Sequence, residues 1–341
     1  PDDEGWAAFE GANLAASCGG GADTPAACYA ASLPYAPVSG ATVPLGARAV
    51  LGHRRLSILD VSPGGHQPMS YRDGRYWIAF NGEIYNHAEL RRELEASGHR
   101  FVSRSDTEVL LAAYAEWGQA CLERLEGMFA FVLVDRAEAT LFAARDRFGI
   151  KPLYYWAAPD RCLAFASEIK QFSVLPGWRA VLNGQRAYDF LAWGILDHTD
   201  ETMFRGVHQL RPGTSVRIDL KQPLAVAPAG RLALHEWYRL AGRPFAGGLE
   251  EAATRFRERF EASVGTHLRA DVPVGSCLSG GLDSSSIVCA MNDLLRREGV
   301  QERQHAFSSC SAIPRFDERE YVEEVVGHTG IEAHYVYPDL G

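Results

Sequence analysis

The feature that most constrains this chain is a loop rich in glycine and serine, LSGGLDSSSIV, at residues 278–288. Apolar and β-favouring residues precede it at 271–277, and residues 285–297 carry apolar side chains at helical spacing. The loop is therefore expected to join a buried strand to the start of a helix. A second strand, HAFSS (305–309), and a helical stretch at about 318–329 follow. This alternation is typical of an α/β domain with a parallel sheet.

The composition of the loop favours a phosphate ligand. Glycine lets the backbone turn sharply and approach a ligand closely, and the N–H groups at a helix start attract anions. The loop lacks the lysine of a Walker A motif and the G-x-G-x-x-G pattern of dinucleotide-binding folds. A tight strand–helix turn capped by its own serines is the alternative interpretation.

Length, charge and cysteine usage exclude several classes of protein. A chain of 341 residues favours two domains, and a net charge of −9 argues against a general nucleic-acid binder. No apolar run suggests a membrane span or a signal peptide. The seven cysteines include no CxxC pair, which favours a cytoplasmic location. The 11 histidines form no metal-spaced cluster, so no metal ligands are predicted.

A strand and a helix are predicted on either side of the segment FNGEIYN. Residues 76–80 read as a strand, which Asn81-Gly82-Glu83 is expected to close. Asn86 is then placed to cap a helix over 87–97.

Further elements follow at close spacing. Ser105 and Glu108 form a capping-box pattern before another helix. FAFVLVD (129–135) and TLFAARD (140–146) predict buried strands, and LAFASEIK (163–170) predicts a strand that turns into a helix. Closely spaced strands between a few helices indicate a layered α+β domain.

Several sequence blocks, taken in order, give this chain a specific resemblance. It resembles the glutamine-hydrolysing asparagine synthetases, which join a class II glutamine amidotransferase domain to an ATP-pyrophosphatase domain. The blocks begin with PDDEG at the first residues and continue as LGHRRLSILD (51–60), GHQPM (65–69), FNGEIYN (80–86), SDTE (105–108), LEGMFAFVLVD (125–135), ARDRFGIKPLYY (144–155), FASEIK (165–170) and SGGLDSS (279–285).

The resemblance implies two folds. The first is a layered α+β N-terminal-nucleophile domain of the class II glutaminase type, expected at 1–180. The second is the start of an α/β ATP-pyrophosphatase domain of the adenine nucleotide α hydrolase-like type, expected at 250–341. Residues 181–249, rich in Pro, Ala and Gly towards their end, are expected to connect them. Too few strands follow the phosphate loop for a complete parallel sheet, so we expect a fragment that lacks both ends.

By resemblance, glutamine would bind in the first domain. The Asn81 side chain and the Gly82 N–H would stabilise the oxyanion that forms at the glutamine amide. Arg55 would hold the α-carboxylate, which suits a guanidinium fork. Glu83 and Asp106 would face the α-amine. For Asp106 the alternative role is capping of the helix that begins there, and the two roles are compatible.

The catalytic nucleophile is where this sequence departs from the family. The family's chains begin Met-Cys-Gly, well before an R-G-P-D-D-E-G segment, and this sequence begins at the proline of that segment. The free α-amine beside the attacking sulfur is part of the mechanism, and Pro1 carries no thiol. We therefore expect no glutaminase activity from the chain as given. Five cysteines are interpreted as structural or incidental: Cys18, Cys28, Cys121, Cys162 and Cys310.

ATP would bind at the glycine- and serine-rich loop. The resemblance implies that an aspartate side chain is activated as an acyl-adenylate, that pyrophosphate and AMP leave, and that ammonia from glutamine attacks. Asp283 would repel phosphate by itself and is better placed for Mg²⁺. The partners implied are L-glutamine, L-aspartate and ATP, and a homodimer is compatible with the sequence. The implied ATP-binding residues are Leu278, Ser279, Gly280, Gly281, Asp283, Ser284, Ser285 and Ser309.

Two other functions fit the same residues. One is a related amide-forming enzyme, such as a β-lactam synthetase or a natural-product or cell-surface amidotransferase, with another carboxylate acceptor. The acceptor pocket is expected beyond Gly341, so the sequence does not choose between acceptors. The other is a nucleotide-binding protein without catalytic activity. The acidic residues of FDEREY (316–321) are interpreted as a helix start rather than as ligands.

Overall fold

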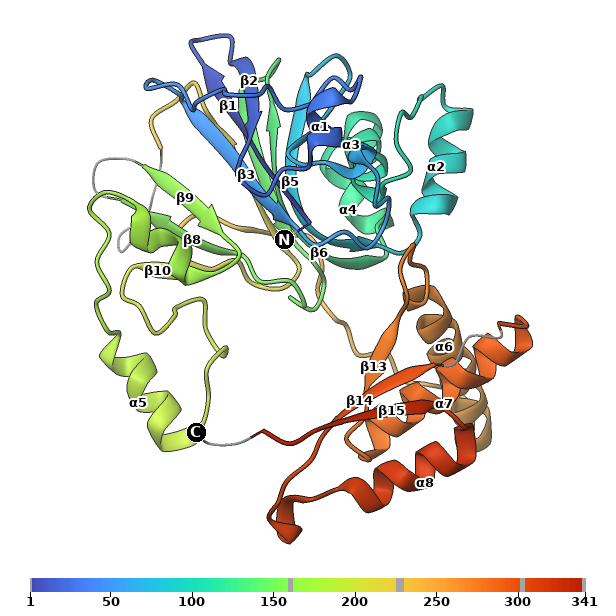
Figure 1. Cartoon of the computed structure of the whole chain (residues 1–341). Coiled ribbons are helices and arrows are strands. Elements are labelled where there is room, and N and C mark those ends of the chain that lie inside the picture. Colours follow the sequence, from blue (N-terminus) through green and yellow to red (C-terminus); the bar gives the residue numbers. More distant parts are fainter. Residues whose placement is uncertain (1, 159–161, 225–229, 301–303, 339–341) are drawn as a thin grey trace. The chain divides into compact units, whose positions relative to one another are not determined.

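The computed structural model describes residues 2–158, 162–224, 230–300 and 304–338. The chain divides into two compact units, Pro1–Ala241 and Gly242–Gly341. Figure 1 shows the helices and strands of both. Among the described residues, no helix has the length and apolar character needed to cross a membrane.

The described residues of the first unit form three antiparallel sheets. Their strand orders are β2-β1-β3, β10-β8-β9 and β12-β11-β7-β6-β5-β4. The strands are β1 (Asp3–Glu10), β2 (Ala15–Gly20), β3 (Ala49–Arg55), β4 (Met69–Tyr71), β5 (Tyr76–Ile84), β6 (Gly127–Asp135), β7 (Thr140–Arg145), β8 (Tyr154–Ala157), β9 (Leu163–Ala166), β10 (Val207–Gln209), β11 (Thr214–Asp219) and β12 (His235–Glu236).

The six-stranded sheet is covered on both faces. Helix α3 packs against β4 and β5, and β3 also lies against β5. Phe9 of β1 meets Trp77 of β5 edge to face, with ring centroids 5.9 Å apart. This is the layered α+β arrangement that the sequence predicts, and it explains why β6 is buried from Phe129 to Asp135. The helices are α1 (Ala26–Ala30), α2 (His87–Ala96), α3 (Asp106–Trp117), α4 (Cys121–Arg124) and α5 (Gly184–Trp193).

One local prediction around β5 is wrong, and a second is confirmed in part: the helix predicted after Asn86 is α2. Asn81-Gly82-Glu83 does not close the strand, because β5 continues to Ile84 in register with β6. Asn86 precedes α2 but its side chain makes no capping bond. Its amide instead donates to the Arg124 carbonyl at 2.9 Å and accepts from the Glu126 N–H at 3.0 Å. A long-range tether to the start of β6 has therefore replaced the local cap.

The predicted capping box at α3 forms only in part. Ser105 does cap the helix, since its hydroxyl accepts from the Thr107 N–H. Glu108 does not bond back to the Ser105 N–H. Its carboxylate accepts from the N–H groups of Val102 and Ser103 at 2.9 and 2.7 Å, and so fixes the loop before the helix.

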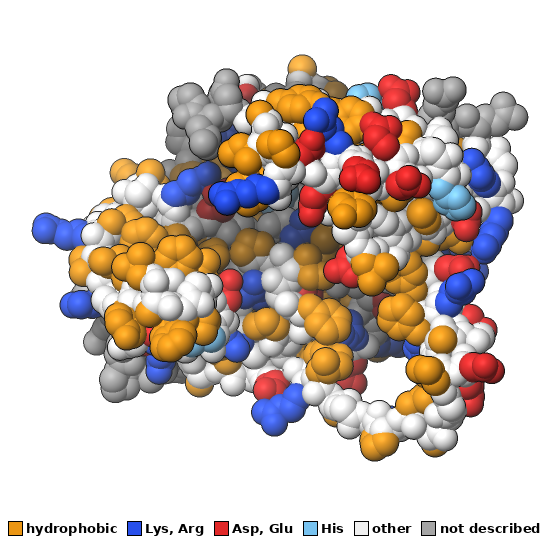
Figure 2. All heavy atoms as spheres, turned by 90° about the horizontal axis from the view of Figure 1, so that it is seen from below, with side chains coloured by type: hydrophobic (Ala, Val, Ile, Leu, Met, Phe, Trp, Pro, Cys, Tyr) orange, Lys and Arg blue, Asp and Glu red, His pale blue; other side chains and the backbone are white. Residues whose placement is uncertain are grey.

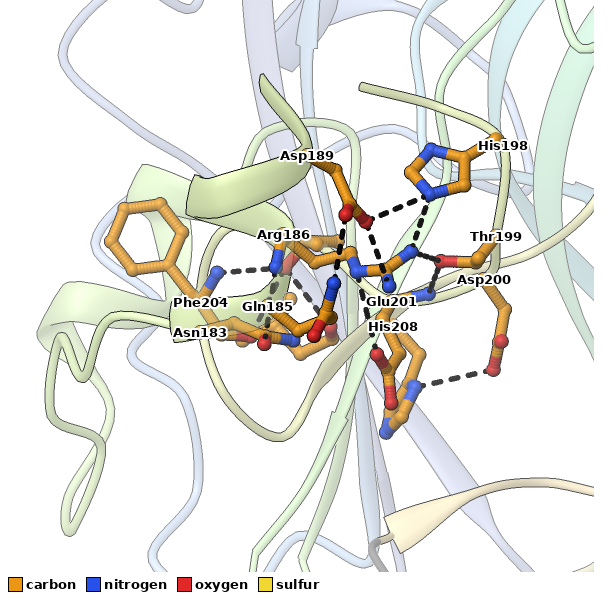
Figure 3. Close-up of polar contacts among 12 residues, drawn as sticks. Asn183, Gln185, Arg186, Asp189, His198, Thr199, Asp200, Glu201, Phe204 and His208 are labelled. Carbon is orange, nitrogen blue, oxygen red and sulfur yellow. Dashed lines mark hydrogen bonds and ion pairs between the residues drawn. The ribbon is translucent and has the colours of Figure 1, made fainter. Parts of the chain in front are cut away.

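Most of the expected connecting region belongs to the first unit. Strand β10 pairs with β8, and β11 pairs with β7, so residues 181–241 are part of this fold rather than a linker. Helix α5 is held by Arg186, which forms an ion pair with Asp189 at 2.9 Å and donates to the Thr199 hydroxyl at 3.0 Å (Figure 3). Asn183 caps the helix.

Several apolar side chains in and after α5 are exposed. Tyr188, Leu191 and Trp193 are all exposed, and Ile195 and Leu196 continue the exposed apolar surface beyond the helix. Figure 2 shows hydrophobic side chains exposed at several places on the face that it presents. The polar contacts of Arg186 therefore fix a helix that leaves several of its own apolar side chains exposed.

The second unit has a parallel sheet of order β13-β14-β15. Residues of α7 and α8 pack on one face of it, around Val288, Ala306 and Val322. The strand HAFSS is confirmed as β14, and the helices predicted before and after it are confirmed as α7 and α8. The elements are α6 (Leu249–His267), β13 (Gly275–Cys277), α7 (Leu282–Arg297), β14 (His305–Ser309), α8 (Arg319–Thr329) and β15 (Glu332–Val336).

A buried carboxylate organises the turn that follows β7. The Asp146 side chain is 1% exposed and accepts hydrogen bonds from the N–H groups of Phe129, Phe148, Ile150 and Lys151 at 3.0–3.1 Å. One side chain thus replaces the backbone partners that strand β6 and the turn would otherwise lack.

We predict that Asp146→Ala destabilises the first unit by about 3 kcal/mol or more, because several buried N–H groups lose their acceptor. Asp219→Ala is the matched control, since the exposed Asp219 accepts from Lys221 N at the end of β11. Urea unfolding followed by tryptophan fluorescence measures both. Equal stability of the two variants would contradict the organising role of Asp146.

Candidate active sites

A cavity of about 680 Å³ lies in the first unit. It is lined from β3, β5 and the start of α3, and also from the segments around Lys151 and Glu168. The structure brings all of the predicted glutamine-site residues to this one cavity: Arg55, Asn81, Gly82, Glu83 and Asp106.

Gly82 is required by the packing of β5 on β6. A Cβ atom at this position would lie 2.2 Å from the Met128 carbonyl oxygen and 2.8 Å from Phe129 Cα. Both are backbone atoms of the neighbouring strand, so they cannot move aside as a flexible side chain would. The resemblance implies a role only for the Gly82 N–H, and the structure shows that packing against β6 also excludes a side chain here.

The N–H of Gly82 points to the edge of β5 that faces away from β6. N–H groups alternate along a strand, and that of Tyr85 points to the β6 side, where it donates to the Glu126 carbonyl. Those of Phe80 and Ile84 point the other way, to the Gln67 and Asp106 side chains at 2.8 and 2.9 Å. The Gly82 N–H lies between these two, on the same edge.

Arg55 ends β3 and is buried. Its Nη2 donates to the carbonyl oxygens of Leu59 and Asp60 at 2.8 and 2.7 Å, and its guanidinium fills the space that a Cβ on Gly65 would need. Burial lowers the pKa of Arg55, and the nearby carboxylates of Asp3, Asp60 and Asp106 oppose that shift. The guanidinium is therefore a fixed cation in the wall of the cavity.

Asp106 is the first residue of α3, and Ser105 rather than Asp106 is the N-cap. Asp106 is 4% exposed, and its carboxylate accepts a hydrogen bond from the Ile84 N–H at 2.9 Å. This bond connects the helix to the end of β5. Burial raises the pKa of Asp106, although the hydrogen bond from Ile84 opposes this. A cation that reached the cavity would favour the ionised carboxylate.

Two residues that hold the β5 backbone were given no role by the sequence. Phe80 carries the peptide that leads into Asn81, and side chains bond to both of its polar groups. The side-chain amide oxygen of Gln67 accepts a hydrogen bond from the Phe80 N–H. His53 Nε2 lies 2.9 Å from the backbone carbonyl oxygen of Phe80. Burial lowers the pKa of His53 to about 4, so the neutral ring donates this bond. His53 lies in the block LGHRRLSILD and Gln67 in the block GHQPM. Their place in these blocks is the sequence signal that could have marked them as site residues.

The cysteines lie away from this cavity. All seven are described, and none is among the residues that line it. Burial raises the pKa of Cys28 to about 11 and that of Cys121 to about 12, which keeps both as unreactive thiols at neutral pH. Pro1 lies outside the described residues.

The glycine- and serine-rich loop joins β13 to α7 as the sequence predicts. Leu278 is buried, and its backbone bonds to β14 through the Phe307 carbonyl and the Ser308 hydroxyl. Gly280 has φ +81°, and a Cβ there would lie 2.6 Å from Cβ of Tyr321. Gly280 is therefore required both by the backbone conformation and by the packing of α8.

Hydroxyl groups line the turn into α7. Ser284 Oγ lies 3.1 Å from Ser279 Oγ and 3.2 Å from the Ser279 N–H, and Gly281 is the N-cap residue. Asp283 is exposed in the first turn. Ser309 ends the neighbouring parallel strand β14, so it lies at the same carboxyl edge of the sheet as the loop. This is the edge at which open α/β sheets bind ligands.

We predict that Gly82→Ala destabilises the first unit by about 2 kcal/mol or more, because the new methyl group must push β5 and β6 apart. Gly52→Ala is the control: Gly52 lines the same cavity, and nothing lies within 4 Å of a Cβ placed there. Thermal unfolding distinguishes the two, and a Gly82→Ala variant as stable as Gly52→Ala would contradict the close approach.

The buried His53 should make stability depend on pH. Its pKa is about 4 in the folded chain and near 6.5 when unfolded, so the unfolded state takes up a proton first as the pH falls. Between about pH 7.5 and about pH 5 this should cost up to about 2 kcal/mol. His53→Asn should remove that part of the pH dependence in urea unfolding. An unchanged pH dependence would show that His53 titrates normally.

Family models match parts of both units. The glutamine amidotransferase domain family matches residues 40–225, which include the cavity residues named above. The asparagine synthase family matches residues 255–339, which include the loop at 278–285.

Similar proteins of known name include synthetases and an amidase. Glutamine-hydrolysing asparagine synthetases 1 and 3 of Bacillus subtilis (strain 168) are 38% identical over 75% of this chain and 32% identical over 84% of it. Amidase chyE of Penicillium rubens is 37% identical over 85%. The chain spans 39%, 46% and 43% of these three relatives, less than half of each. The chain belongs to the glutamine amidotransferase family, and its second unit matches the asparagine synthase family.

Proposed function

We propose that this chain is part of an ATP-dependent synthetase that takes ammonia from glutamine and forms the side-chain amide of asparagine from aspartate. The observation that carries the proposal is that Arg55, Asn81, Gly82, Glu83 and Asp106 line one cavity. A second unit with a phosphate-type loop on a parallel sheet supplies the matching ATP site.

The cavity offers opposite charges for the two ends of an amino acid. Arg55 is a fixed buried cation that suits the α-carboxylate of glutamine. Asp106 and Glu83 suit the α-ammonium group. Burial raises the pKa of the Asp106 carboxylate and so disfavours its ionised form. A bound ammonium group would lower that pKa again and favour the ionised form. Glutamine binding should therefore stabilise the ionised form of Asp106.

The same strand supplies donors for the reacting amide. The Gly82 N–H points to the edge of β5 that carries the Gln67 and Asp106 contacts, and the Asn81 side chain lines the cavity beside it. Two donors at adjacent positions can stabilise the oxyanion that forms when a thiolate attacks the glutamine amide. His53 and Gln67 hold this strand, and so position Asn81 without touching the substrate.

In the second unit we assign ATP to the loop between β13 and α7. The helix start and the hydroxyls of Ser279 and Ser284 can bind the phosphates. Asp283 is exposed in the first turn of α7, and a carboxylate at a phosphate site fits Mg²⁺, which would neutralise the phosphate charge there. Aspartate activation as an adenylate, a cytoplasmic location and a homodimer belong to the same proposal.

A second candidate is an amide-forming enzyme with a different carboxylate acceptor. The amidase from Penicillium rubens is as similar to this chain as the synthetases are. The glutamine and ATP sites would be the same in either case, and only the acceptor would differ. Pyrophosphate release measured with a panel of carboxylates, aspartate first, separates the two candidates.

We predict that this chain binds L-glutamine and that Arg55→Ala weakens binding at least about a hundredfold, because a charge-assisted bidentate contact is lost. Arg124→Ala is the control, since Arg124 pairs with Glu93 at the surface and does not line the cavity. Calorimetric titration measures both. Equal glutamine affinity in the two variants would refute the assignment of the cavity.

For the ATP site we predict that Gly280→Ala abolishes binding of MgATP, because φ +81° and the contact with Tyr321 both exclude a Cβ. Gly327→Ala on α8 is the control, since nothing lies within 4 Å of a Cβ there. Fluorescent-nucleotide displacement measures the affinity. Unchanged nucleotide binding in Gly280→Ala would show that ATP does not bind at this loop.

A further inference from the structure

The sheet of the second unit has one face that its helices leave open. Ala306 and Tyr335 belong to the face that packs against α7 and α8. Side chains alternate along a strand, so Phe307 and Val336 belong to the opposite face, and both are exposed. His305 of β14 has the same orientation as Phe307.

Three metal-ligating side chains meet on this open face. His305 of β14 is the register partner of Glu332 of β15, and His334 follows Glu332 two residues later on the same side of the sheet. His305 Nδ1 lies 2.9 Å from His334 Nε2, which lies 3.7 Å from Glu332 Oε1. All three donor atoms lie within 4.8 Å of one another.

These separations are those of a tetrahedral metal site. Zinc–nitrogen and zinc–oxygen bonds of about 2.0–2.1 Å at tetrahedral angles place neighbouring ligand atoms about 3.3 Å apart. The two measured separations lie on either side of that value. The ring of Phe307 stacks on His334 with centroids 5.0 Å apart, so packing already fixes the orientation of that imidazole.

A second cluster of possible metal ligands lies close to the Arg55 cation, which makes it a poorer cation site. Asp3, Cys28 and His66 also lie within 4.8 Å of one another and are buried. The Arg55 cation is near enough to interact electrostatically with both Asp3 and Cys28. It would therefore repel a metal cation bound there. The open-face cluster is therefore the better metal site among the described residues.

We propose that His305, Glu332 and His334 form a binding site for a transition-metal dication of the Zn²⁺ class. Two imidazoles and one carboxylate favour zinc over Mg²⁺, which prefers oxygen ligands. A water molecule would complete the coordination, because the open face leaves the fourth direction accessible. The site is separate from the ATP loop, since His305 and Glu332 begin their strands and the loop follows the carboxyl end of β13.

The metal would join two strands that the chain connects only through α8. In a parallel pair the bonds between strands come from backbone groups, and a shared ion would add a side-chain cross-link between β14 and β15. Because the ion binds the folded sheet and not the separate strands, it would stabilise the second unit in proportion to its affinity.

Zinc titration of the whole chain tests the proposal. Calorimetry should give one more equivalent of tightly bound Zn²⁺ in the wild type than in the double variant His305→Ala/His334→Ala, and Glu332→Gln should weaken that equivalent at least about tenfold. His328→Ala is the matched control, because His328 is exposed on α8 in the same unit. It should bind Zn²⁺ as the wild type does. Counting the difference between variants removes any zinc held by the free cysteines.

Equal zinc stoichiometry in the wild type and the double variant would overturn the proposal. A measurement on the unmodified chain guards against misfolded variants: crystals soaked in Zn²⁺ should show an anomalous peak between the three donor atoms at the zinc absorption edge. Zinc peaks elsewhere and none at this position would also overturn it. Neither experiment depends on whether the chain binds glutamine or ATP.

Discussion

The close approach of β5 and β6 at Gly82 is the constraint on which the first unit depends. It allows the buried sheet to form and at the same time turns the Gly82 N–H towards the opposite edge of the strand. On that edge Gln67, His53 and Asp106 bond to the β5 backbone. Strand β5 pairs with β6 along one edge, and side chains bond to its other edge. The backbone N–H groups on that second edge therefore face the cavity. Packing and binding thus rest on the same residue.

The two candidate sites are built in different ways. In the first unit, side chains from β3, β5 and α3 converge on a cavity. Hydrogen bonds hold the Arg55 guanidinium in place, and burial raises the pKa of Asp106. In the second unit, the backbone of a single loop and the start of one helix make up the site, with serine hydroxyls around it. The first arrangement suits recognition of both ends of an amino acid, and the second suits phosphate groups of a nucleotide.

Much of this could be predicted from the sequence, and the exceptions have physical causes. Periodicity located β6, β14 and α8 because their burial is regular. It failed at Asn81, where a turn-like sequence continues as a strand. The helix after Asn86 is confirmed, but the Asn86 side chain bonds to a distant backbone carbonyl and does not cap it. Residues 181–249 resemble a linker because they are rich in Pro, Ala and Gly towards their end, yet β10 and β11 pair with β8 and β7. His305 and His334 meet only through the parallel register of β14 and β15, which no sequence spacing reveals.

The measurement that tests the central claim most directly compares nitrogen sources in the protein isolated from its host. ATP-dependent amide formation would be assayed with glutamine and with ammonium salts, in the wild type and in Asn81→Ala. If the first unit only supplies ammonia to the second, Asn81→Ala should lose the glutamine-supported rate and keep the ammonium-supported rate. An equal loss of both rates, or no loss of either, would contradict the division of work between the two units.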